Sequence, residues 1–171
     1  MVDFEKILSG GDLRSIGKSK SVIAEIKNQK DFDELFEYLF HIDRIIVMRS
    51  VDAIEKITID KPNYLKKHKK NIFELLNIAN DKELQWHLAL LIPRLNLDYN
   101  EFEKAWNKLT YWAKDKTNSR IVRVNSIQAL FELMKQQKGL EKDFSLTLSE
   151  LEKENIPSIN ARIRKLKNAS N

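Results

Sequence analysis

Apolar and small side chains recur along this chain at a constant interval, which we call the repeat interval: Leu84 follows Ile46 by the same number of positions as Val122 follows Leu84. Each of the three blocks that start at these residues continues four, seven, eight and eleven positions further on. Residues at these spacings lie on one face of an α-helix. A weaker fourth block starts at Ile159, one position earlier than the repeat interval predicts, and continues with Ile163 and Leu166. The remaining positions of the first three blocks are Ser50, Ala53, Ile54 and Ile57; Leu88, Leu91, Ile92 and Leu95; and Ser126, Ala129, Leu130 and Leu133.

A further helix is predicted before each block, so the repeating unit is a pair of helices. Helical pairs that recur at such an interval are typical of an α-solenoid. Asp43 and Asp81, separated by the same repeat interval, are expected to cap the second helix of their pairs, and Pro93 is expected to bend its helix. We predict an all-α fold in one domain, divided into an N-terminal cap with a glycine-containing loop (1–30), three repeats (31–60, 61–98 and 99–138) and a degenerate C-terminal repeat (139–171).

Residues 122–130 follow the pattern V-R-x-x-S-x-x-A-L after an asparagine-containing turn, and this pattern resembles the second helix of a HEAT repeat. Residues 46–54 and 84–92 are looser copies, because they lack the arginine that the HEAT pattern prefers. The resemblance covers about residues 31–168. It implies a short right-handed α-solenoid of about four HEAT-like hairpins behind an N-terminal capping helix. It also implies that the chain binds other macromolecules, because HEAT arrays mostly do so and share no catalytic motif.

The composition excludes several classes of protein. Four glycines and three prolines in 171 residues leave little material for tight β-turns. Because the chain has no cysteine, it has no disulfide, no thiolate zinc site and no cysteine nucleophile. The N-terminus has no apolar stretch of signal-peptide length, and no segment approaches the roughly 18 apolar residues of a membrane span. We therefore expect a cytoplasmic protein with no membrane partner.

The net charge of +5 is unevenly distributed. Residues 61–70 contain five lysines and no acidic residue, and the tail from Ser158 contains only basic charged residues: Arg162, Arg164, Lys165 and Lys167. One interpretation is that these cations provide solubility and stabilise the last turns of helices. The other is that they form a basic surface that docks on phosphate or on an acidic protein.

Residues 9–19 (SGGDLRSIGKS) end like a phosphate-binding P-loop. Five residues separate Gly11 from Gly17 where that motif has four, and no strand precedes them, so an NTPase is not predicted. Arg14, Lys18 and Lys20 could still bind an anion together with the N-terminus of the following helix. The alternative is a connection that lets the N-terminal helix fold back over the first repeat.

No catalytic, metal or cofactor site is predicted from the sequence. The three histidines lie far apart, at His41, His68 and His87, and no second histidine joins any of them at a metal-binding spacing. We expect His41 and His68 to be solvated. Trp106 and Trp112 lie six residues apart on one helix, so one is expected in the core and the other partly exposed.

Equivalent residues of the second helices would stack into columns on one concave surface. The columns that follow the block starts mix cations, amides and one large aromatic side chain, a composition suited to gripping a partner. Trp86 could instead pack between repeats, and Arg123 could instead bond the carboxylate of a neighbouring turn. The predicted partner-binding residues are Arg49, Gln85, Trp86, His87, Arg123 and Asn125.

The favoured function is a non-enzymatic module that holds a protein or peptide on this concave face. The alternative is a nucleic-acid-binding protein related in fold to HEAT-like DNA glycosylases. The cleft residues of those enzymes cannot be matched in this sequence. A third possibility is a subunit whose terminal repeats pair with another chain, which exposed apolar residues on the terminal helices would favour.

Overall fold

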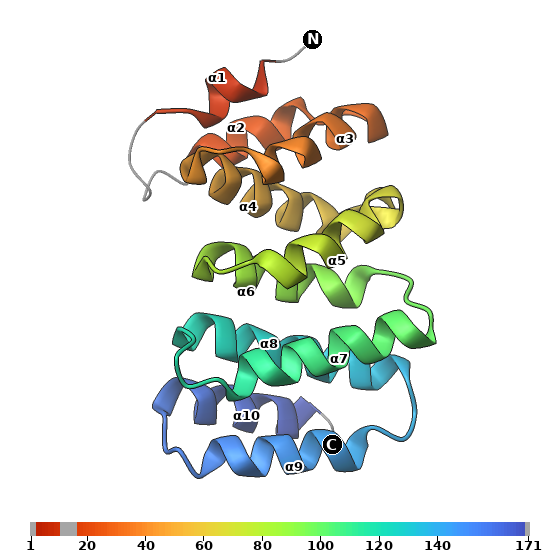
Figure 1. The fold of residues 1–171 in the computed structure, drawn as a ribbon, viewed down its shortest axis with the longest axis vertical. Helices are drawn as coiled ribbons and strands as arrows, with labels where there is room; N and C mark the ends of the chain where they lie inside the picture. Colours follow the sequence, from red (N-terminus) through yellow and green to blue (C-terminus); the bar gives the residue numbers. More distant parts are fainter. Residues whose placement is uncertain (1–2, 11–16, 170–171) are drawn as a thin grey trace. The chain divides into compact units, whose positions relative to one another are not determined.

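The computed structural model describes residues 3–10 and 17–169 (Figure 1). Within these residues it contains α-helices and short 3-10 helices and no β-strand, which confirms the prediction of an all-α fold. The chain folds into two compact units, unit 1 (Met1–Ala79) and unit 2 (Asn80–Asn171). None of the helices in the described ranges combines the length and the apolar character that a membrane crossing requires.

Unit 1 is built around its longest helix, α4, which packs against α1, α2, α3, η1 and η2. The apolar face of α4 that the repeat predicts is buried by these neighbours. In chain order the elements are α1 (Phe4–Leu8), α2 (Gly17–Glu25), α3 (Gln29–Glu37), η1 (Tyr38–Phe40), α4 (Arg44–Asp60), η2 (Pro62–His68) and α5 (Lys69–Ile78).

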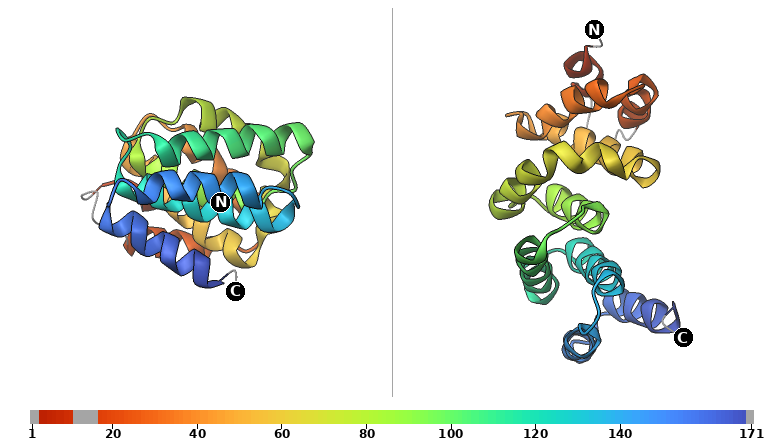
Figure 2. Two further views of the ribbon diagram at one scale, coloured as in Figure 1. Left: turned by 90° about the horizontal axis from the view of Figure 1, so that it is seen from below. Right: turned by 90° about the vertical axis from the view of Figure 1, so that its right-hand side faces the viewer.

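Unit 2 is built in the same way around α8, which packs against α6, α7, α9 and α10. Within this unit α6, α8 and α10 form one layer, and α7 and α9 lie together on one side of it (Figure 2, right). The elements are α6 (Lys82–Leu91), η3 (Ile92–Arg94), α7 (Tyr99–Lys114), α8 (Arg120–Gln136), α9 (Glu141–Glu152) and α10 (Pro157–Ala169).

The four apolar blocks form the buried faces of their helices. Every position of the blocks is buried except Leu84, which is half-buried. The serines at equivalent positions, Ser50 and Ser126, are fully buried, and the Ser126 hydroxyl donates to the Val122 carbonyl at 2.8 Å. The repeat interval therefore identified the core face of each second helix correctly.

Two local predictions require correction. Asp43 accepts a capping hydrogen bond from the Ile45 N–H at 2.8 Å, but the equivalent Asp81 precedes α6 without making a side-chain capping bond. Pro93 does not bend a continuous α-helix: α6 ends at Leu91, and the chain continues as a 3-10 turn, η3. Proline has no N–H to donate, and its ring clashes with the carbonyl four residues earlier, so the α-helix ends before it.

The short helix α1 is held in unit 1 by its apolar side chains and by one arginine. Phe4 and Leu8 are buried, and α1 packs against α2 and α4. Arg49, on α4, donates from Nη1 to the carbonyl oxygen of Leu8 and, at 2.7 Å, to that of Gly10. This arginine is only 1% exposed. It donates to carbonyl groups at and just after the end of α1, where the helix itself supplies no N–H donors.

Both tryptophans of α7 are buried, contrary to the prediction that one would be partly exposed. Trp112 is 1% exposed and Trp106 is 7% exposed. The Trp106 indole N–H donates to a carboxylate oxygen of Asp143, near the start of α9, at 2.8 Å. A polar partner on the adjacent helix allows the second indole to be buried as well.

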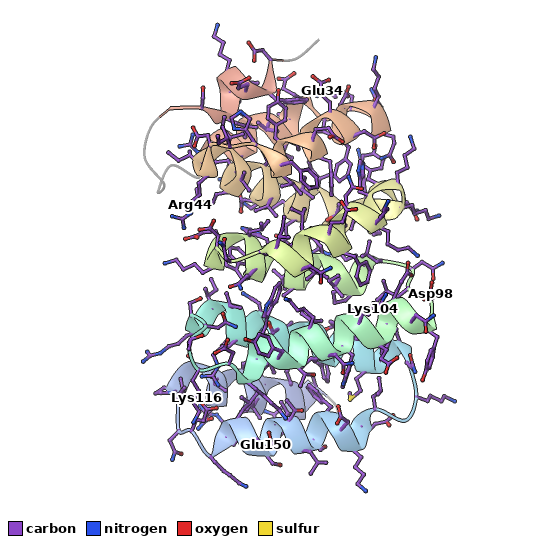
Figure 3. The ribbon with its side chains drawn as sticks, viewed as in Figure 1. Glu34, Arg44, Asp98, Lys104, Lys116 and Glu150 are labelled. Atoms are coloured by element: carbon purple, nitrogen blue, oxygen red, sulfur yellow. The ribbon has the colours of Figure 1, made fainter. Side chains whose placement is uncertain are left out.

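Replacing Arg49 with methionine should destabilise unit 1. The change keeps much of the side-chain volume but removes the guanidinium that donates to the buried carbonyl of Leu8, a loss of about 1–3 kcal/mol for a buried polar group. Urea denaturation followed by circular dichroism measures it. Arg44→Met, an exposed arginine on the same helix (Figure 3), is the control and should leave stability nearly unchanged. Equal stability of the two variants would contradict this role of Arg49.

Candidate functional site

Most of the predicted partner-binding residues lie in the interior of their own unit. Trp86 and Asn125 are half-buried, whereas the other four side chains are between 1% and 8% exposed: Arg49, Gln85, His87 and Arg123. A second helix packs against its pair partner and against neighbouring helices, so several of its sides are covered. The predicted columns therefore contain mainly structural side chains, and a partner can reach only a few of them.

Arg123 makes the ion pair with a neighbouring turn that was the alternative interpretation of this residue. Its Nε donates to the carbonyl oxygen of Ala113 at 2.8 Å. One Nη donates to both carboxylate oxygens of Glu154, at 2.8 and 2.9 Å. Glu154 belongs to the α9–α10 turn, where Asn155 adopts a left-handed conformation with φ of 54°. Arg123 thus joins the end of α7 to the turn that precedes α10.

Trp86 is placed by its neighbour His87 on α6. The two rings are stacked with their centroids 3.4 Å apart, and His87 is only 2% exposed. The Trp86 ring is half-buried, so part of it is available to a partner. In this respect the structure agrees with both interpretations of Trp86, packing and contact.

One accessible side of α8 lies beside its apolar block, because the side opposite the block carries Ile127 and Phe131, which are buried. Ile121, Asn125, Gln128 and Glu132 follow each other at helical spacing, and none of them is buried. We call these four residues, together with Arg162 of α10, the open face of unit 2. Asn125 was predicted from the sequence as a contact residue of the concave face, Arg162 was considered only as part of a basic tail, and Gln128 was not predicted.

A row of hydrogen bonds fixes most of the open face. Arg162 donates to Oε1 of Gln128 at 2.6 Å, and the Gln128 amide donates to Glu132 at 2.8 Å. Lys135 adds an ion pair with Glu132 at 2.9 Å. These bonds join α10 to α8 and hold the side chains in place. Because the row alternates donors and acceptors, it presents a defined polar pattern.

Asn125 is the member of the open face whose side-chain amide has no hydrogen-bond partner among the described residues. It is half-buried and stands three residues before Gln128 on a helix with a packed core side. An amide of this kind offers one acceptor and two donor hydrogens. It is therefore available to bond a partner that has both kinds of group.

Unit 1 contains a hydrogen-bonded histidine–carboxylate pair in which the histidine is buried, which corrects the prediction of a solvated His68. His68 is 7% exposed, its ring stacks on Phe36 with centroids 4.0 Å apart, and its Nε2 lies 2.7 Å from Oδ1 of Asp33. Gln29 and Lys67 also donate to Asp33, at 2.6 and 3.2 Å. Burial raises the pKa of Asp33, whereas the hydrogen bonds from Gln29, His68 and Lys67 and the electrostatic attraction of His68 lower it, and the net result is a pKa below the ordinary value.

The predicted anion site is only partly visible. Arg14 lies outside the described residues, as does the side chain of Lys18, and Lys20 is exposed on α2. Within residues 3–10 and 17–169, no group of three or more His, Asp or Glu side chains is placed to hold a metal ion. An open groove of about 530 Å³ lies between α8, α9 and α10, with an apolar floor formed by Met134, Phe144, Leu148 and Leu166.

Comparisons with protein-family models, with curated proteins and with solved structures find no match to this chain.

Glu154→Ala should destabilise unit 2 by about 3 kcal/mol, because it leaves a buried guanidinium without its counter-charge. The matched control is Glu150→Ala, also on the outer hairpin of unit 2 (Figure 3). Glu150 forms an ion pair with Lys114 at 2.7 Å but is largely exposed, so removing it should lower the stability of unit 2 far less. Chemical denaturation of both variants measures the difference. Similar losses of stability for the two variants would show that the buried Arg123–Glu154 pair stabilises unit 2 no more than an exposed ion pair does.

Acidification should weaken unit 1 partly through Asp33. A carboxyl whose pKa is lower in the folded than in the unfolded chain stabilises the fold above its unfolded pKa, and this contribution is lost as the pH falls through the folded pKa. Between about pH 5 and pH 2 the wild type should therefore lose stability more steeply than Asp33→Asn. Denaturation midpoints at a series of pH values test this. Parallel curves for the two proteins would exclude Asp33 as a source of the acid sensitivity.

Proposed function

We propose that this chain is a non-enzymatic binding module that holds a segment of another protein on the open face of unit 2. The Asn125 amide carries this proposal. It is half-buried on a packed helix and has no hydrogen-bond partner among the described residues, so a partner can bond it by replacing water, without breaking a hydrogen bond within the protein.

A peptide backbone is the ligand that fits these groups. Asn125 supplies both donor and acceptor, and the neighbouring row from Arg162 to Glu132 adds alternating donors and acceptors. The peptide group has one N–H and one carbonyl, which match such a pattern. The Arg162, Gln128 and Glu132 side chains are already held by mutual hydrogen bonds, so less of their conformational entropy is lost when a partner binds.

We also propose that the helical pairs form a short right-handed solenoid of HEAT-like hairpins. The constant repeat interval between core faces supports this architecture. The layer of α6, α8 and α10, with α7 and α9 on one side, agrees with such stacking inside unit 2. In an array of this kind the second helices provide an extended surface for a partner.

The test is recovery of interacting proteins on the immobilised chain from a lysate of the cells that produce it. Wild type is compared with an open-face variant and with a control variant that makes the same change in charge on exposed positions of α7 and α9. The open-face variant carries Asn125→Ala, Gln128→Ala and Arg162→Ala, and the control carries Lys104→Ala, Asn107→Ala and Ser149→Ala.

A specific partner should be recovered by the wild type and the control but about tenfold less by the open-face variant, since contact residues at the centre of an interface carry most of the binding energy. Thermal unfolding must show that both variants are folded. Equal recovery of every protein by all three chains would reject the open face as the binding site.

A further inference from the structure

The lysine-rich segment of unit 1 is exposed over most of its length. Residues 61–70 form η2 and the start of α5, and they contain five lysines and no acidic residue. Four of the lysine side chains are exposed, and we call them the lysine surface: Lys61, Lys66, Lys67 and Lys70. The charge of this surface is not balanced within its own segment.

Three members of the lysine surface have no ion-pair partner among the described residues, and one of them, Lys61, lies over the Tyr64 ring with its Nζ 5.3 Å from the ring centroid. Lys67 contacts Asp33 at 3.2 Å, but no carboxylate among the described residues pairs with Lys66 or Lys70. Lysines elsewhere in the chain do find such partners, for example Lys167 with Glu152 at 2.8 Å. The fold thus leaves the charges of Lys66 and Lys70 available to a ligand.

Helix stabilisation does not account for the position of Lys70. Cations stabilise the last turn of a helix, where the carbonyl ends carry partial negative charge, and they are disfavoured in the first turn. Lys70 stands in the first turn of α5, and this first turn contains no acidic residue. This charge therefore works slightly against the helix that contains it, and interaction with an external anion is a reason for its presence.

The backbone that carries the lysine surface is held in place by contacts with the interior of unit 1. Leu65 is fully buried, and His68 is buried against Phe36 and bonded to Asp33. The carbonyl of Tyr64 accepts a hydrogen bond from Gln29 at 3.1 Å. These contacts hold η2 against α3, so the backbone that carries the exposed lysines of η2 is held in a defined position.

We propose that the lysine surface binds the phosphodiester backbone of nucleic acid. Lysine ammonium groups are compact point charges that bind phosphate without requiring a particular geometry, and a row of them suits a regularly charged chain. The segment has no exposed large apolar side chain that could insert into a bilayer: Leu65 is buried and Tyr64 half-buried. This activity is separate from the peptide site of unit 2, since it uses other residues.

The experiment measures binding to a fluorescein-labelled DNA duplex of about 20 base pairs by fluorescence polarisation over a range of salt concentrations. The test variant is Lys66→Gln with Lys70→Gln. The control, Lys104→Gln with Lys116→Gln, changes the net charge equally by removing two exposed and unpaired lysines of unit 2 (Figure 3). Vesicles of anionic phospholipid form a second arm with the same proteins.

Wild type and control should bind the duplex with an affinity that falls steeply as salt increases. The test variant should bind more weakly, and the slope of log affinity against log salt should be shallower by about 1.8, since each phosphate contact contributes about 0.9. Absence of salt-dependent binding would overturn the proposal. Equal weakening of the control would attribute binding to net charge alone, and binding to vesicles but not to the duplex would assign the surface to membranes; either result also overturns it.

Discussion

Burial of one apolar face per helix is the constraint on which both units depend. A helical pair of this size cannot cover its own apolar face, so it must pack against neighbouring helices. In unit 1 the neighbours gather around α4, and in unit 2 they gather around α8. The central position of α4 and of α8 then decides which of their polar residues are enclosed and which stay accessible.

The core faces could be predicted from sequence because they depend on local periodicity alone. Residues at spacings of three and four must share a helix face, whatever lies opposite. The blocks from Ile46 and Val122 were therefore identified correctly, and the α-helical character with them. The end of α6 before Pro93 was missed because a proline is compatible with either a bend or a change to a 3-10 turn, and only the surrounding packing decides.

The candidate site was harder to predict because a column of equivalent residues does not show which sides of the helix are covered. Arg49 reaches carbonyl groups 39 and 41 residues away, and His68 bonds a carboxylate 35 residues away. Long side chains extend beyond their own position, and their partners come from other elements. The pairing of Gln128 with Arg162 joins two different columns, which a comparison of single columns cannot find.

Arg49 and Arg123 differ in what they require of the residues around them. Arg49 bonds the main-chain oxygens of Leu8 and Gly10, and the Nε of Arg123 bonds that of Ala113, whereas the Nη of Arg123 needs the Glu154 carboxylate. A carbonyl oxygen is present whichever amino acid carries it, so the main-chain bonds respond to the path of the backbone. These main-chain bonds therefore depend on the path of the backbone, which the buried Leu8 and the positive φ of Gly10 (70°) help to set, whereas the bonds to Glu154 depend on a carboxylate at that one position.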